Sequence, residues 1–314
     1  MRALLSVLAI PLAACGASDS MGSDAALMTA TCGKNGGEAC FELPTEAVMV
    51  KTADGTSSTP ANVACAAKER KTSEKEIVVS GLVKDFQTGN GVSGAKVDAF
   101  LTLDFSKPDV TVTADPTGAY SLTLPVGTPN FMNWRTREAM ALDTYSLAQN
   151  LDVSQDEIEN YERGSVSQAT ADALPAFIGV TRSPGLGVLA GSALDCDGKS
   201  VMHAIANIST TSSAGNAAPT FVPGVQVYYF SAGATELPTR RTKRADSNSN
   251  GLFVLIEIPP SAGTTQYYLQ TWGFVTAEDV AKGKEGLKLL SEYEAPVVGD
   301  SVIAIDLLPT QGPL

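Results

Sequence analysis

Histidine is almost absent from this sequence, and its scarcity limits the chemistry available to the protein. The chain of 314 residues contains a single histidine, His203. A zinc peptidase needs at least two histidine ligands, a glutamate ligand and a general base, and Ser-His-Asp or Cys-His mechanisms need a histidine beside the nucleophile. His203 lies in KSVMHAIANIS, among apolar residues, which favours a structural or surface role. We therefore expect no catalytic residues, no metal and no cofactor.

Positive charge and long apolar runs are also lacking. The chain has 22 Lys plus Arg against 34 Asp plus Glu, a formal net charge of -12, which disfavours nucleic acid as a partner. Beyond the N-terminus, no stretch approaches the roughly 18 apolar residues of a membrane helix. The apolar share of 44% is ordinary for a folded protein, and the length suits two domains.

The N-terminus has the pattern of a signal peptide. Arg2 precedes a short apolar stretch, Ala3 to Ala13, which is too short to span a bilayer. The stretch closes with Leu12-Ala13-Ala14-Cys15, which resembles the lipobox of bacterial lipoproteins. The resemblance implies a signal peptide over residues 1–14, lipidation of Cys15 and a flexible tether over residues 15–31. Gly16 after the cysteine implies sorting to the outer membrane.

Four further cysteines indicate disulfides in an oxidising compartment. They are Cys32, Cys40, Cys65 and Cys196, which allow three pairings. We favour Cys32 with Cys40, which are close in sequence, and Cys65 with Cys196, which would attach the N-terminal segment to the second domain. A metal site is the rival interpretation, but no CxxC-like pair or nearby histidine supports it.

An internal repeat dominates the rest of the chain. Three blocks recur in the same order, at offsets that grow from 110 to 130 to 133 residues. The growth indicates an insertion near Ser209 to Thr220, which is polar and loop-like. Each block is rich in β-branched and aromatic residues and is bounded by turn residues, as in an all-β sandwich. The matched pairs are VVSGLVKD (from Val78) with VLAGSALD (from Val188), SGAKVDAF (from Ser93) with PGVQVYYF (from Pro223), and GAYSLTLPVG (from Gly118) with GLFVLIEIPP (from Gly251).

The repeated pattern VxGxVxD, GxxGAxV and DxxGxYxLxLPxG resembles the carboxypeptidase regulatory-like domain. That resemblance implies a transthyretin-like sandwich at residues 75–150 and again at 185–314, and a domain that accompanies an enzyme without doing chemistry. We therefore expect an all-β fold of two tandem transthyretin-like or Ig-like β-sandwiches. A Cys-containing segment, 32–74, would precede them and a short helical connector, 151–184, would join them.

Helical signals are few. The capping-box pattern Ser154-Gln155-Asp156-Glu157 predicts a short helix with Ile158 and Tyr161 on one side. A second helix is expected from Ser167 to near Gly179, with a kink at Pro175. Residues Thr276 to Leu290 also look helical, although Gly283 and Gly286 interrupt them, and Val302 to Leu308 alternates as a closing strand.

Two polar motifs could hold ligands. The first matches the EF-hand loop pattern and reads Asp246-x-Asn248-x-Asn250-Gly251-x5-Glu257. The segment that follows the motif is strand-like, whereas an EF-hand needs a helix there. We therefore favour a polar hairpin turn over a calcium turn formed by Asp246, Asn248 and Asn250. Arg240-Arg241-Thr242-Lys243-Arg244 is the one dense basic cluster. It could hold an anionic glycan or lipid phosphate, although we favour a solvated hairpin loop.

An aromatic row offers a further candidate surface. Tyr268, Gln270, Trp272 and Phe274 alternate on one face of an expected strand, and Tyr228 and Phe230 lie on another. Such rows stack on sugar rings in many β-sandwich modules. Core packing explains the same residues, and we favour it because only 6% of the chain is aromatic.

These observations favour a non-enzymatic cell-envelope lipoprotein whose sandwiches act as spacer or protein-interaction modules. The alternative is a carbohydrate-binding surface lipoprotein, and an enzyme working with carboxylates alone is a remote third class. The expected location is the outer membrane, facing the periplasm or the cell surface. The expected partners are the membrane, through the lipid, and envelope proteins or glycans.

Overall fold

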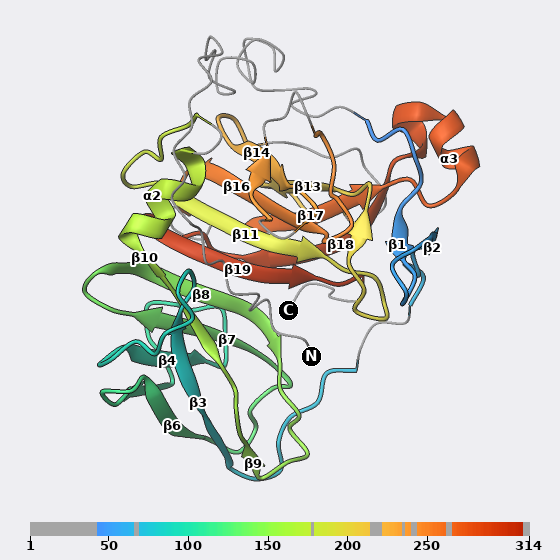
Figure 1. Ribbon diagram of the computed structural model, residues 1–314. Coiled ribbons are helices and arrows are strands. Elements are labelled where there is room, and N and C mark those ends of the chain that lie inside the picture. Colours follow the sequence, from blue (N-terminus) through green and yellow to red (C-terminus); the bar gives the residue numbers. More distant parts are fainter. Residues whose placement is uncertain are drawn as a thin grey trace. The chain divides into compact units, whose positions relative to one another are not determined.

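The protein is built almost entirely from β-strands, as the computed structural model shows (Figure 1). The structure describes residues 43–65, 69–176, 179–213, 222–233, 236–239, 244–261 and 266–309. These residues divide into two compact units. Unit 1 contains Glu69–Ala173 and Asp300–Ile305, and unit 2 contains residues 43–65, Leu174–Gly299 and 306–309. The expected all-β fold class is confirmed.

Unit 1 is a β-sandwich. One layer has the order β6-β3-β10 and the other the order β5-β4-β7-β8, with β9 beside β3, and the pair β10–β8 joins the two layers at one edge. Neighbouring strands are antiparallel, except that β9 and β10 run parallel to β3. The first half of β19 (Ser301–Leu307) lies parallel to β8. The other bounds are β3 (Ile77–Asp85), β4 (Lys96–Phe100), β5 (Val110–Thr113), β6 (Ala119–Leu124), β7 (Phe131–Arg137), β8 (Ala141–Asn150), β9 (Glu157–Ile158) and β10 (Arg163–Ser167).

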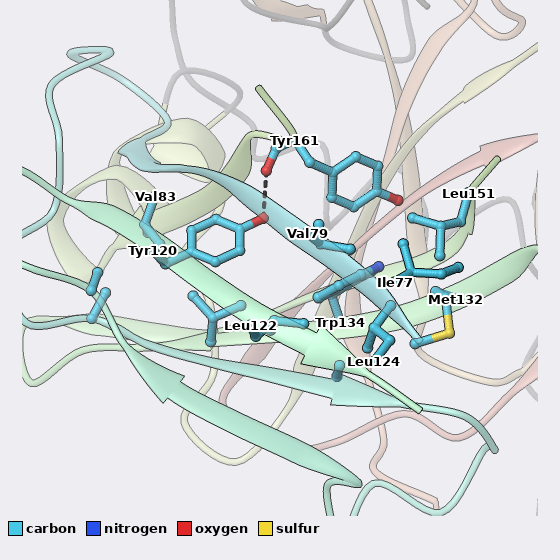
Figure 2. Close-up of a cluster of buried hydrophobic side chains, with 14 residues drawn as sticks. Ile77, Val79, Val83, Tyr120, Leu122, Leu124, Met132, Trp134, Leu151 and Tyr161 are labelled. Carbon is cyan, nitrogen blue, oxygen red and sulfur yellow. Dashed lines mark hydrogen bonds between the residues drawn. The ribbon is translucent and has the colours of Figure 1, made fainter. Parts of the chain in front are cut away.

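The core of unit 1 follows directly from the two-residue period of its strands (Figure 2). Strands β3 and β6 supply alternate apolar side chains from one sheet, and β4 and β7 supply theirs from the other. Tyr120 adds a hydrogen bond from its hydroxyl to the carbonyl oxygen of Tyr161. Burial of each large aliphatic side chain stabilises the fold by about 1.5–3 kcal/mol. The principal members are Ile77, Val79, Val83, Val97, Ala99, Tyr120, Leu122, Leu124, Met132 and Trp134.

Unit 2 contains three sheets, with the orders β15-β14-β16-β11, β13-β17-β18 and β12-β1-β2. The Oη of Tyr229, on β14, accepts a hydrogen bond from the backbone N–H of Ala206, on β13, so a side chain of the first sheet reaches the second. The bounds are β1 (Met49–Lys51), β2 (Ser58–Pro60), β11 (Gly187–Ala193), β12 (Val201–Met202), β13 (Ile205–Ser209), β14 (Gln226–Phe230), β15 (Pro238–Thr239), β16 (Leu252–Ile258), β17 (Tyr267–Gly273) and β18 (Lys288–Ala295).

The internal repeat appears in the structure as two antiparallel strand pairs of the same register. Gly81 lies opposite Tyr120 in the pair β3–β6, and Gly191 lies opposite Phe253 in β11–β16. The carbonyl oxygens of Gly118 and Gly251 accept matching hydrogen bonds, from the N–H groups of Val83 at 2.8 Å and Ala193 at 2.9 Å.

Both turn glycines are structurally required. Gly118 and Gly251 have φ angles of +86° and +68°, and a Cβ on them would lie 2.8 Å from the oxygen of Val83 and 2.6 Å from that of Ala193. The middle block differs between the copies, because β4 pairs with β5 and β7 whereas β14 pairs directly with β16. The repeat therefore preserves the antiparallel pair but not the position of the middle strand.

The expected helices are only partly present. The prediction of a helix at Ser154–Glu157 is wrong. Glu157 and Ile158 form strand β9, which pairs with Val78 and Val79 of β3. Ile158 packs on the core of unit 1, and this tertiary contact overrides the capping pattern. The helix from Ser167 is confirmed as α2 (Gln168–Ala176), whereas β9 and β10 occupy other parts of the expected connector.

The expected helix at Thr276–Leu290 is shorter than predicted. It consists of α3 (Ala277–Ala281), capped by Thr276, and the 3-10 helix η1 (Gly283–Gly286), and β18 then begins at Lys288. The α-helix ends before Gly283, whose φ is +59°. The prediction of a helix that continues to Leu290 is therefore wrong. The closing strand is confirmed as β19. Within the described residues, none of the helices is long and apolar enough to cross a membrane.

Candidate functional site

The segment that follows the expected tether is an integral part of unit 2. This N-terminal strap (residues 43–65) contains β1, whose Val50 pairs with Val201 on β12. The N–H of Val48 donates a hydrogen bond to the carbonyl oxygen of Phe274 at 2.7 Å. Val48 and Val50 are fully buried in one cluster with Leu290.

A disulfide closes the end of the strap. Cys65 and Cys196 are bonded, with 5.8 Å between their Cα atoms. This confirms one of the two expected disulfides. Cys15, Cys32 and Cys40 lie outside the described residues. The strap is thus held by strand pairing, by core packing and by a covalent bond.

The aromatic row predicted on β17 lies mostly inside the protein. Trp272 is 0% exposed, Phe274 1% and Tyr228 0%, whereas Tyr268 and Phe230 are half-buried. Trp272 and Phe274 pack with Ile205 and Leu287. A sugar ring therefore cannot stack on Trp272, Phe274 or Tyr228 in this conformation, and core packing accounts for these three side chains.

The centre of the same face is a buried polar row across β13, β17 and β18. Asn207, Gln270 and Glu292 are register partners on these strands. The side-chain oxygen of Gln270 accepts hydrogen bonds from Asn207 Nδ2 at 3.1 Å and from Trp272 Nε1 at 3.0 Å. Its Nε2 donates to Glu292 Oε2 at 2.8 Å and to Ser213 Oγ at 3.0 Å. The amide of Gln270 is therefore fully bonded although its side chain is completely buried.

The carboxylate of Glu292 is held from the other side. Ser212 Oγ donates to Oε1 at 2.6 Å, and the backbone N–H of Ser213 donates to Oε2 at 2.8 Å. A half-satisfied polar network costs stability, but a fully satisfied one fixes a unique register. This row therefore aligns the three strands. Sequence reasoning placed Gln270 on the aromatic face but missed its partners, because the register of β13 and β18 is not visible in the sequence.

The EF-like motif forms a turn whose polar atoms already have protein partners. Asp246 accepts a hydrogen bond from Arg244 Nη1 at 3.2 Å, and Asn250 Nδ2 donates to the carbonyl oxygen of Ser231 at 3.0 Å. Asn248 Oδ1 accepts from the N–H of Ser249. Glu257 lies on β16, where its Oε1 accepts from the N–H of Ser183.

Each of the four motif residues therefore forms a hydrogen bond within the protein. Among the residues that the structure describes, no group of three or more His, Cys, Asp or Glu side chains could hold a metal ion. In the basic cluster, Arg240 to Lys243 lie outside the described residues. Arg244 forms an ion pair with Asp246.

His203 joins this turn to the strap. Its Nδ1 lies 3.5 Å from Asp246 Oδ2, and its Nε2 lies 3.9 Å from Glu46 Oε2. The hydrogen bond with Asp246 raises the pKa of His203 above its usual 6.5, against the opposing effect of burial, and the charges of Asp246 and Glu46 act in the same direction as the bond. The side chain thus has a structural role that depends on its charge.

A buried ion cluster on unit 1 was not foreseen from the sequence. Asp98, on β4, is 0% exposed and accepts hydrogen bonds from Arg135, Arg137 and Thr111 at distances of 2.7 to 2.9 Å. Burial alone would raise the pKa of Asp98, but the bonds from the two arginines and the threonine lower it overall. The signal in the sequence is the alternation of Arg135 and Arg137, but the pairing of β7 with β4 was needed to interpret it.

Comparisons with known proteins give distant similarities. No protein-family model matches the sequence, and no curated protein matches it. The shaft pilin SpaA of Lactobacillus rhamnosus GG is 11% identical, with 76% of this chain and 97% of the pilin covered and a TM-score of 0.20. A candidate carbohydrate-binding protein of Bacteroides uniformis is 12% identical, with 72% and 98% covered and a TM-score of 0.22.

A minor pilin of Streptococcus agalactiae is 9% identical, with 74% of this chain and 94% of the pilin covered and a TM-score of 0.20. Similarities at this level do not identify a family. The fold assignment rests on the strand pairing and the core described above.

Proposed function

We propose that this protein is a lipid-anchored cell-envelope protein whose β-sandwich units act as spacer or protein-interaction modules. The observation that carries the proposal is the attachment of the strap. The lipobox-like sequence ends at Cys15, and the described chain that follows is fixed to unit 2 by β1 and by the Cys65–Cys196 disulfide. A force on the lipid anchor would therefore be transmitted into a folded sheet and a covalent bond.

The buried polar groups favour a structural role over carbohydrate binding. Asn207, Gln270 and Glu292 bond to one another and to nearby serines, and Asp98 is held by two arginines. These groups stabilise strand register, and the burial of Trp272 and Tyr228 removes the strongest stacking residues from the surface. The outer membrane, facing the periplasm or the cell surface, is the proposed location.

Fractionation of bacterial cells that produce the full chain tests the proposal. The wild-type protein should sediment with membranes, and Cys15→Ala should release it or leave it as an unprocessed precursor. Cys40→Ala is the matched control, because it removes a cysteine from the same region without touching the lipobox-like residues, and it should stay with membranes. A processed Cys15→Ala protein that still sediments with membranes as the wild type does would refute the proposed anchor.

A further inference from the structure

Arg163 is a buried cation inside the sandwich of unit 1. It lies on β10 opposite Val83 of β3, and Val83 belongs to the apolar core. The residue is only 7% exposed. The centre of its guanidinium lies 4.1 Å from the ring centroid of Tyr161 and 5.4 Å from that of Trp134. Aromatic faces therefore surround the charge.

The charge of Arg163 lacks an acidic partner among the described residues. Its Nε and Nη1 atoms are buried without a hydrogen-bond partner there, and so is Nε1 of Trp134. The neighbouring acidic residue Glu162 pairs with Lys84 instead. An arginine cannot lose its proton in a protein, and a buried charge or N–H group without a partner is strongly unfavourable.

Two tyrosines supply the polar oxygens beside these donors, and although burial raises the pKa of both hydroxyls, Arg163 opposes that rise. The carbonyl oxygen of Tyr161 accepts the hydroxyl of Tyr120, and the Tyr161 hydroxyl donates to the carbonyl oxygen of Asn150 at 3.3 Å. The Trp134 and Tyr161 ring centroids are 5.4 Å apart, so the indole and the guanidinium adjoin the same tyrosine ring (Figure 2 shows Trp134 and Tyr161). Three N–H groups, Nε and Nη1 of Arg163 and Nε1 of Trp134, thus lie buried around one guanidinium charge.

We propose that Arg163 and Trp134 form a binding site for a small monovalent anion, with chloride as the fitting ion. Such an ion accepts several N–H groups at once and neutralises the guanidinium, which is what these donors lack. The near-complete burial of Arg163 excludes large anions and the side chains of a partner protein. The site is independent of the anchoring function proposed above.

Chloride-dependent unfolding of the full chain tests the site. Urea unfolding, followed by tryptophan fluorescence, is measured from 1 to 300 mM chloride, with gluconate holding the ionic strength constant. If chloride binds only the folded protein, the unfolding equilibrium constant of unit 1 should fall about tenfold for each tenfold rise in chloride above the dissociation constant. Direct binding is read from the broadening of the ³⁵Cl NMR signal, which bromide should reverse by competition.

Variants separate the site from general salt effects. Arg163→Met should abolish both the chloride dependence and the ³⁵Cl broadening, whereas Lys96→Met, which removes an exposed cation from the same unit, should keep them. If Arg163→Met fails to fold, Trp134→Phe removes a single donor and should weaken chloride binding about fivefold. This variant is read by the ³⁵Cl signal, because Trp134 is the tryptophan of unit 1. Equal stability in chloride and gluconate, or unchanged chloride binding in either site variant, would overturn the proposal.

Discussion

Replacing both Cys65 and Cys196 with alanine removes a covalent link between residues 131 apart in the sequence. If the whole chain unfolds together, closure of a loop of this length in the unfolded state corresponds to about 5 kcal/mol of stabilisation. If unit 2 unfolds while unit 1 stays folded, the unfolded part of the loop is about 25 residues long, and the stabilisation is about 3.5 kcal/mol. We therefore predict that the double variant loses about 3.5–5 kcal/mol of unfolding free energy in unit 2.

Urea unfolding of the oxidised wild type and of the double variant measures this loss. With a urea m-value of about 3 kcal/mol/M, the midpoint should fall by about 1.2–1.7 M. Wild-type protein treated with a reductant should reproduce the shift, measured against the variant in the same reductant, because the predicted Cys32–Cys40 bond would be reduced in both. A loss below about 1 kcal/mol would refute the view that the disulfide holds the strap on unit 2.

Three further changes test the packing and the electrostatics. Trp272→Ala should destabilise unit 2 by about 3–5 kcal/mol in urea unfolding, because its side chain is fully buried; a loss under 1 kcal/mol would contradict its place in the core. Because the pKa of His203 is raised in the folded state, its contribution, under about 1 kcal/mol, should be complete below pH 6.5 and disappear as the pH rises through the folded value. His203→Asn, which suits the φ of +63°, should remove that pH dependence from urea midpoints between pH 6 and 8.5, and an unchanged profile would exclude His203 as its source. Asp98→Asn should destabilise unit 1 by about 3 kcal/mol, since it leaves two arginines without their carboxylate; a thermal midpoint equal to that of the wild type would argue against the cluster.

The sequence was most informative where structure depends on neighbouring residues. The repeated strands and their turns were predictable because β-propensity, turn glycines and a period of two all act locally, and Gly118 and Gly251 occupy equivalent turns. The Cys65–Cys196 bond was predicted from the cysteine pattern, because Cys32 and Cys40 are close in sequence and the remaining pair would attach the N-terminal segment to the second domain.

The failures share a different cause, which is tertiary contact. Ile158 joins a sheet instead of a helix because it pairs with β3 and packs on the core of unit 1. The polar row around Gln270 and the arginines around Asp98 depend on which strands are neighbours and in what register. The packing of the strap, which places Val48 and Val50 in a cluster of unit 2, also depends on tertiary contact. None of these contacts has a local signature in the sequence.

The most direct test of the central claim, lipid anchorage of a folded β-sandwich protein, is the intact mass of the protein extracted from bacterial membranes. We predict a mature chain that begins at Cys15, carries the mass of covalently attached acyl chains and loses the ester-linked ones on mild alkaline hydrolysis. A membrane-extracted protein with an unmodified Cys15, or one cleaved at another position, would contradict the claim.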